Sequence, residues 1–130
     1  VKHLLKNEQY FLQCGSPETS VSCMKLSNDG KLLATGQKTH DGFATSAWIW
    51  DLESRKVLHK LDLYKGSIQA VSFSPSNEYL ATLGGPADNK LVIWNVKSGD
   101  AICGCPAAND TALCCSFSNT NDHVLVTAGK

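Results

Sequence analysis

Apolar and polar positions along this chain alternate in short runs, and one arrangement of them occurs three times. In each copy an apolar residue, two spacers, an apolar residue, one spacer and another apolar residue are followed by serine. Short runs of this kind, bounded by Gly, Asn, Asp and Ser, are typical of β-strands. The three copies are Val21, Met24, Leu26 and Ser27; Ile68, Val71, Phe73 and Ser74; and Ala112, Cys115, Phe117 and Ser118.

Each copy continues into further predicted strands. A turn such as Asn28-Asp29-Gly30 leads to a second strand, at residues 31–36, 79–82 and 124–129. In the first two copies a third strand ends on a matching dipeptide, Trp50-Asp51 and then Trp94-Asn95. A fourth strand completes each of them, at residues 57–61 and 101–103.

These units predict an all-β fold in which each unit is a four-stranded antiparallel sheet. The strands carry apolar residues on both faces, so each sheet needs a cover on both sides. Identical sheets stacked radially as the blades of a β-propeller provide that cover, and the repeat length agrees. Within this one, truncated propeller domain we expect residues 1–19 to be the final strand of a preceding blade and a linker. Residues 20–66 and 67–110 are expected to be blades, and residues 111–130 the first two strands of another.

Propellers usually close with about four to eight blades, and the predicted units are fewer. We therefore expect the chain to be a segment of a longer propeller. Its two outer sheet faces should expose apolar side chains, and the segment alone should self-associate or be poorly soluble.

Charge and composition narrow the function. The formal net charge is zero, with 12 basic and 12 acidic residues, which argues against nucleic acid as a partner because such proteins usually carry a basic face. No apolar run reaches the roughly 18 residues of a membrane span, and no signal-peptide pattern is visible. These features favour the cytoplasm and no membrane partner.

The chain has six cysteines, which favour core packing over chemistry. They lie in or beside apolar runs, where reduced thiols act as small hydrophobes. Cys103-Gly104-Cys105 and Cys114-Cys115 lack the spacing of structural zinc ligands, so no metal and no cofactor are expected. His40-Asp41 with Ser46 lacks the nucleophile elbow of a hydrolase, so no catalytic residue and no enzyme are predicted.

Several of these motifs are similar to WD40 repeats, from about residue 8 onward. They are Trp50-Asp51, residues 27–31 (Ser-Asn-Asp-Gly-Lys) and Phe73-Ser74-Pro75. The resemblance implies that Trp50 and Trp94 are core aromatics and that Asp51 and Asn95 accept turn hydrogen bonds. The Gly-His dipeptide of the family is absent, and Lys65-Gly66 stands near its place. The family's buried His–Ser/Thr–Trp network should therefore be incomplete, leaving the blades to rely more on packing.

A narrower resemblance rests on residues 34–37 (Ala-Thr-Gly-Gln), Gly42-Phe43 and Ile49-Trp50-Asp51. They resemble the echinoderm-type microtubule-associated WD proteins and a family of tandem-propeller WD proteins of cilia. Residues 83–88 and 100–108 resemble the ciliary family more closely. That family implies a non-enzymatic structural protein of the cilium or flagellum axoneme. Its partners would be the lumenal face of doublet-microtubule tubulin and other axonemal inner proteins. A generic cytosolic adaptor or scaffold propeller is the alternative.

Binding residues are expected in the loops before the third strands, since loops on rigid scaffolds carry function. The loops are Gln37–Ser46 and its shorter equivalent Gly85–Lys90. Both should lie at the same end of the propeller. Phe43 is compatible with anchoring its loop inward or with touching a partner. The candidate partner contacts are Lys38, His40, Asp41, Phe43, Asp88 and Lys90.

Overall fold

The computed structural model describes residues 2–3, 8–9, 11–12, 19–39, 43–107 and 110–130. Within these residues every regular element is a strand, so there is no helix that could cross a membrane. The strands are β1 (Lys2–His3), β2 (Glu8–Gln9), β3 (Ser20–Leu26), β4 (Leu32–Lys38), β5 (Ala44–Asp51), β6 (Lys56–Lys65), β7 (Ile68–Phe73), β8 (Tyr79–Gly84), β9 (Lys90–Asn95), β10 (Ala101–Pro106), β11 (Ala112–Phe117) and β12 (Leu125–Gly129).

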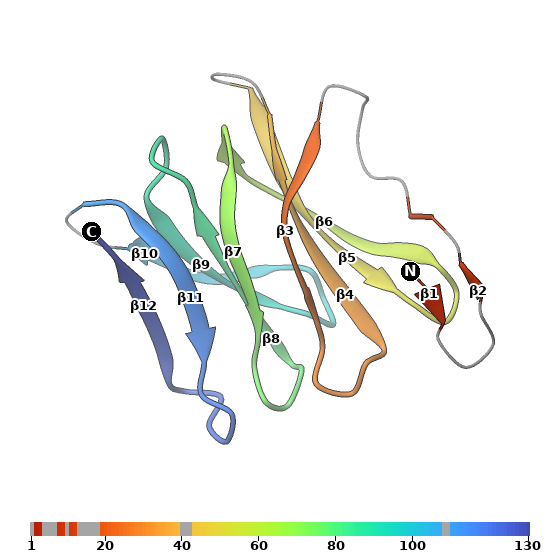
Figure 1. Ribbon diagram of the computed structural model, residues 1–130. Helices are drawn as coiled ribbons and strands as arrows, with labels where there is room; N and C mark the ends of the chain where they lie inside the picture. The colour runs from red at the N-terminus through yellow and green to blue at the C-terminus, as the bar shows by residue number, and fades with distance from the viewer. Residues whose placement is uncertain (1, 4–7, 10, 13–18, 40–42, 108–109) are drawn as a thin grey trace.

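Two four-stranded antiparallel sheets dominate the fold, with strand orders β3-β4-β5-β6 and β7-β8-β9-β10. Strands β11 and β12 form a hairpin beside the second sheet, and β1 pairs with β2. Figure 1 shows the hairpin and the two larger sheets standing side by side as a fan, with β3, β7 and β11 along one side. No sheet among the described strands is closed. The predicted all-β fold with the four-stranded blades of an incomplete propeller is confirmed.

A β-bulge explains the unusual spacing of the repeated apolar triplets. The register shifts between Val21 and Cys23 in β3, between Ile68 and Ala70 in β7, and between Ala112 and Cys114 in β11. Side chains on a regular strand share a face at every second residue, and a bulge inserts one residue into that count. The triplet therefore stays on one face despite its two-residue spacer.

The triplet of β7 packs into the core between the two large sheets. Ile68, Val71 and Phe73 are at most 6% exposed and cluster with Leu80, Val92 and Trp94 of their own sheet. The first sheet supplies the other side of this cluster with Ala34, Ala47, Ile49 and Leu61. The side chains that each sheet presents to its neighbour are thus apolar, as the repeat pattern predicted.

The equivalent triplet of β3 has no such cover among the described residues. Val21, Met24 and Leu26 are 50%, 60% and 52% exposed. At the opposite end of the fan, Leu113 of β11 and Val126 of β12 are 48% and 61% exposed. Both outer faces therefore present apolar side chains to solvent, as expected from the number of units.

Turns at one end of the fan link neighbouring units through hydrogen bonds. The Asn28 amide nitrogen donates to the backbone oxygens of Ser74 and Pro75, at 3.0 and 3.2 Å. One unit further along, the Ser76 backbone N–H donates to Asp122 at 3.0 Å, and the Ser76 hydroxyl donates to the same carboxylate. These hydrogen bonds lower the pKa of Asp122 below its usual value.

Candidate interaction surface

The two candidate loops are shorter and more alike than the sequence indicated. Strand β4 runs to Lys38 and β5 begins at Ala44, so residues 39–43 form the first loop. The second loop, residues 85–89, has the same length. The prediction of a loop from Gln37 to Ser46, and of a shorter counterpart, was wrong because both strands extend further along their ladder. Figure 1 shows the end of β4, the start of β5 and the link from β8 to β9 at the end of the fan opposite the β3–β4 and β11–β12 turns.

The link between β6 and β7 ties these loops together. The Thr39 backbone N–H donates to the Gly66 oxygen at 2.7 Å, and the Gly66 N–H donates to the Phe43 oxygen at 3.0 Å. On the other side, the Gly85 N–H donates to the Ser67 oxygen at 2.8 Å. Gly66 has a φ of 84°, a left-handed conformation that favours glycine. This loop end is therefore held by backbone hydrogen bonds across two units.

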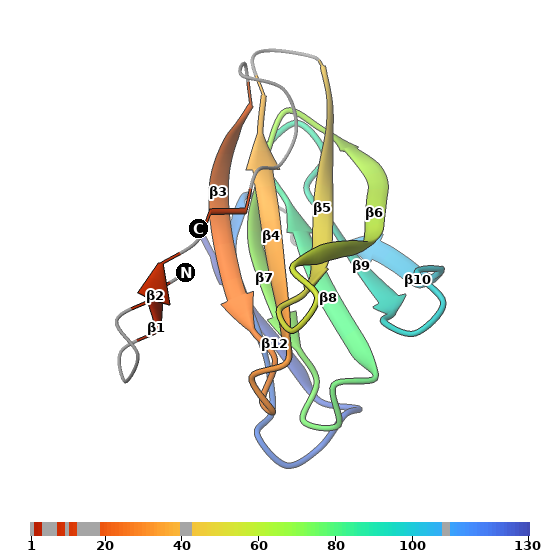
Figure 2. The same cartoon turned by 90° about the vertical axis from the view of Figure 1, so that its right-hand side faces the viewer.

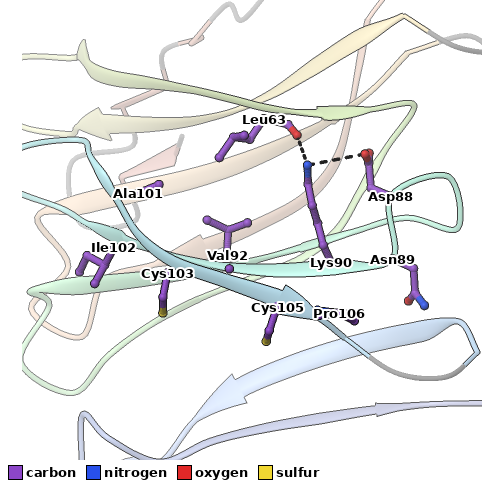
Figure 3. A pocket seen from close by; sticks show the side chains of 11 residues that line it. Leu63, Asp88, Asn89, Lys90, Val92, Ala101, Ile102, Cys103, Cys105 and Pro106 are labelled. Carbon is purple, nitrogen blue, oxygen red and sulfur yellow. Dashed lines mark hydrogen bonds and ion pairs between the residues drawn. The ribbon is translucent and has the colours of Figure 1, made fainter.

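Asp88 and Lys90 are engaged inside this end rather than projecting from it. Asp88 accepts a hydrogen bond from the Lys65 backbone N–H and pairs with Lys90 at 3.8 Å. The Lys90 ammonium donates to the Leu63 backbone oxygen and lies 5.1 Å from the centroid of the Tyr64 ring. Figure 3 shows the Lys90 side chain reaching from β9 to β6. These two charged residues hold neighbouring sheets together.

Lys38 and Phe43 are presented differently. Both side chains are exposed, Phe43 by 69%. Of the two arrangements open for Phe43, the described structure has its ring in solvent rather than anchored inward. His40 and Asp41 lie outside the described residues. Of the residues described in this region, Lys38 at the end of β4 and Phe43 just before β5 are thus accessible, and hydrogen bonds to Gly66 hold Thr39 and Phe43 in place.

The tryptophans lie behind this surface in the sheets. Trp50 and Trp94 are 3% and 4% exposed. The indole N–H of Trp50 donates to the Thr35 hydroxyl at 3.1 Å, and that of Trp94 donates to the Thr82 hydroxyl at 2.7 Å. Trp48 stacks on Trp50, with ring centroids 5.8 Å apart.

The residues that follow these tryptophans accept hydrogen bonds in tight turns. The Asp51 carboxylate accepts from the Glu53 backbone N–H at 3.1 Å and from the Ser54 hydroxyl at 2.9 Å. Asn95 accepts from the Ser98 backbone N–H at 3.0 Å. Such side-chain-to-backbone bonds are a common way for Asp and Asn to stabilise turns.

Comparison with known proteins accounts for this architecture. A model of the family "WD domain, G-beta repeat" (WD40) matches residues 8–51 and 55–95. The chain belongs to the WD40 family. The WD40 β-propeller domain of Cps50 (Swd1) from Myceliophteria thermophila superposes with a TM-score of 0.71 at 23% identity, covering 83% of this chain and 32% of that one. The structure of U3-55K gives 0.72 at 19% identity, covering 89% and 34%.

Curated WD40 relatives give a narrower likeness. Cilia- and flagella-associated protein 52 of Chlamydomonas reinhardtii is 46% identical over 94% of this chain, and the human protein of that name is 42% identical over 95%. Human echinoderm microtubule-associated protein-like 2 is 29% identical over 85% of the chain. The chain spans about 20% of the length of the two ciliary relatives. The resemblance to this ciliary WD family, stated from the motifs, is confirmed.

Sequence reasoning missed one residue of the buried hydrogen-bond network around Thr82 and Trp94. Tyr64 is 2% exposed, and its hydroxyl lies 2.6 Å from the Thr82 hydroxyl and 2.9 Å from the Thr82 backbone oxygen. Burial raises its pKa, so the phenol is neutral. Tyr64 stands two residues before Gly66, close to where the family's histidine is expected. The only feature of the sequence that could have indicated its role is its position as an aromatic residue at the end of an apolar run. The hydrogen-bond network of the second sheet, completed by Tyr64 from the first, is therefore more extensive than predicted.

The expected core position of the cysteines is wrong for three of them. Cys103, Cys105 and Cys114 are exposed, whereas Cys23 and Cys115 are partly buried. Burial raises the pKa of Cys115 to about 12 and also raises that of Cys23, so both are protonated thiols at neutral pH. Across the described part of the chain, no group of His, Cys, Asp and Glu side chains is arranged to hold a metal ion.

Proposed function

We propose that this chain is part of a non-catalytic structural WD-repeat protein of the cilium or flagellum. The observation that carries the proposal is the 42–46% identity to proteins named cilia- and flagella-associated protein 52, over nearly the whole chain. A second relative, named as microtubule-associated, favours the cytoskeleton as the place of action. The proposed partners are the lumenal face of tubulin in doublet microtubules and other axonemal inner proteins.

The loop formed by residues 39–43, together with Lys38 at its start, is the proposed contact. Hydrogen bonds to Gly66 fix Thr39 and Phe43, so little ordering of these two residues opposes binding. Lys38 offers a positive charge to an acidic protein surface, and the Phe43 ring supplies an apolar contact of the kind enriched at interfaces. Asp88 and Lys90 contribute indirectly, by holding the neighbouring loop against Lys65 and Leu63.

A charge reversal tests this contact in the complete protein. Lys38→Glu combined with Phe43→Ser should weaken co-sedimentation with purified doublet microtubules by about tenfold or more, since each 1.4 kcal/mol of binding free energy is a factor of ten. The matched control is Lys97→Glu, an exposed lysine in the turn between β9 and β10 at the other end of the fan. Equal binding of both variants and the wild type would contradict the loop assignment.

A generic cytosolic adaptor is the competing function, because it requires only the WD40 repeats. The two functions differ in where the complete protein resides. We expect a tagged protein to concentrate along the axoneme and to remain there after detergent extraction. A diffuse signal with no axonemal fraction would overturn the ciliary proposal, whatever the loop variants do.

A further inference from the structure

Two of the exposed cysteines lie on one face of strand β10. Cys103 and Cys105 are both exposed, and a single residue, Gly104, separates them. Side chains two residues apart on a strand share a face, and Figure 3 shows both sulfur atoms on the same side of the β10 ribbon. Core packing, the role expected for the cysteines from the sequence, therefore does not account for this pair.

The spacing of the pair is within reach of a disulfide bond. Cys103 and Cys105 pair with Ile93 and Leu91, so the backbone between them is regular strand. Each residue of a strand advances by about 3.3 Å, which places the two Cα atoms about 6.6 Å apart. Disulfides join cysteines whose Cα atoms are usually about 4.4–6.8 Å apart. A small shortening of the backbone therefore brings the two sulfur atoms into bonding distance.

Gly104 is not required by the strand itself. Its φ lies outside the left-handed region that favours glycine. A Cβ at this position would stand 3.5 Å from a Val92 methyl carbon and 3.6 Å from the Leu91 oxygen, which is ordinary van der Waals contact. A glycine inside a strand lowers its stability relative to alanine, because more backbone freedom is lost on folding. What glycine supplies here is that backbone freedom, between two thiols.

The position of β10 at the edge of its sheet permits the backbone to adjust. Strand β10 pairs with β9 alone, and Figure 2 shows it at the outer side of the second sheet. A distortion of residues 103–105 disturbs the ladder to one neighbour, whereas the same distortion in β8 or β9 would disturb two. The pair thus combines exposed thiols, suitable spacing and an adjustable backbone.

The other described cysteines lack this combination. Cys114 and Cys115 are adjacent in β11, so their side chains point to opposite faces of the strand. Cys115 and Cys23 are partly buried. Cys114 is therefore an exposed thiol without a second cysteine on its own face of β11, and it serves as the matched control.

We propose that Cys103 and Cys105 form a reversible dithiol–disulfide site, which exchanges with small-molecule disulfides of the glutathione class. The thiolate of one cysteine attacks a sulfur of the small molecule, which forms a mixed disulfide and releases one small-molecule thiolate. The thiolate of the other cysteine then attacks the protein sulfur of the mixed disulfide. This step closes the Cys103–Cys105 bond and releases the second small-molecule thiolate. The protein loses two electrons and two protons, and the small-molecule disulfide gains them as two thiols.

The closed form is expected to be readily reduced. A disulfide between cysteines this close along a strand is strained, and strained, exposed disulfides are the labile ones. The site therefore stays a dithiol under reducing conditions and closes when small-molecule disulfide accumulates. It is separate from the loop at residues 39–43 and does not depend on a ciliary role.

The test uses the complete protein, incubated in its native state with glutathione disulfide. Remaining thiols are then blocked with N-ethylmaleimide, and peptide mass spectrometry with fragmentation separates Cys103 and Cys105 from Cys114. We expect the segment with the pair to carry no maleimide and to be lighter by two hydrogens, and dithiothreitol to restore both thiols. Unreacted thiols at both positions, stable glutathione adducts alone, or a bond from either cysteine to Cys114 would overturn the proposal.

Three variants test the mechanism by the same measurement. Cys103→Ser removes the second thiol, so glutathione should remain attached to Cys105 as a mixed disulfide. Gly104→Val keeps both thiols but stiffens the backbone between them, and the closed fraction should fall by about threefold or more. Cys114→Ser should close the bond as the wild type does. Unchanged closure in Gly104→Val would contradict the role of Gly104, and lost closure in Cys114→Ser would overturn the Cys103–Cys105 pairing.

Discussion

The two four-stranded sheets have the same strand order and the same repeated triplet, yet they bury it to opposite extents. Phe73 of the second sheet is 5% exposed, whereas its counterpart Leu26 in the first sheet is 52% exposed. The difference lies in what stands next to each sheet, since β7 packs on the first sheet and β3 faces outward. Burial in this fold is therefore a property of the junction between units, not of the unit.

The buried polar networks differ in the same way. In the first sheet the Thr35 hydroxyl accepts from Trp50. In the second, Thr82 accepts from Trp94 and also contacts the Tyr64 hydroxyl, which comes from β6 of the preceding sheet. A network that reaches across the junction couples two units, whereas one confined to a sheet does not.

The largest expected difference between the two sheets is in the free energy of unfolding that is lost when equivalent apolar residues are truncated to alanine. Phe73→Ala should lower the free energy of unfolding by about 3–5 kcal/mol, because it leaves a cavity in the junction. Leu26→Ala should cost less than about 1 kcal/mol in this chain, since the side chain is already half in solvent. Urea denaturation of the 130-residue chain measures both. Similar losses would mean that β3 is covered in solution, for example by self-association.

A smaller effect separates the two threonines. Thr35→Val leaves the Trp50 N–H without its acceptor, at a cost of about 1–3 kcal/mol. Thr82→Val does the same to Trp94 and also removes the contact with Tyr64, so we expect about 1 kcal/mol more. The comparison is made by urea denaturation, with the corresponding serine variants, which retain the hydroxyl, as controls. An equal loss at the two sites would show that Tyr64 adds nothing across the junction.

The smallest effect concerns pH at the turns. Hydrogen bonds from Ser76 lower the pKa of Asp122, so this carboxylate stabilises the fold above the pKa of an ordinary aspartate. The contribution is lost as the pH falls through the lowered value. The preceding junction uses the Asn28 amide, which does not titrate. NMR titration should show the Asp122 pKa rise towards normal in Ser76→Ala, with Asp29 unchanged because its own pKa is lowered within its turn. No rise in Ser76→Ala would contradict this origin of the shift.

Local pattern was sufficient to predict the fold. The triplets, the Asn-Asp-Gly turn and the recurring tryptophans are all short-range signals, and they led to four-stranded antiparallel units. The ends of the strands were harder to predict. Strand β6 extends to Lys65, beyond the predicted end at residue 61, because its ladder with β5 continues to Ala44. A ladder ends where its partner does, which neither strand reveals alone.

The candidate surface was harder to predict than the fold. Lys38 and Lys90 look alike in sequence, as lysines beside a loop, yet one is exposed and the other reaches across to β6. Tyr64 was missed for the same reason, since its partner Thr82 is brought close only by the packing of two sheets. Whether Lys38, Phe43 and the residues between them contact a partner stays a prediction.

The close approach of Tyr64 to Gly84 limits how these repeats can be exchanged or redesigned. A Cβ at Gly84 would stand 2.8 Å from the Tyr64 ring, so the ring occupies the space of a side chain. The matching position of the first sheet is Gln37, paired with Val21 as Gly84 is paired with Ile68. If a copy of the first unit replaced the second, the glutamine that corresponds to Gln37 would stand at the position of Gly84 and would clash with the Tyr64 ring. A consensus sequence built from the two units would clash at this point if it kept Tyr64 but replaced Gly84. The two residues therefore have to be retained as a pair.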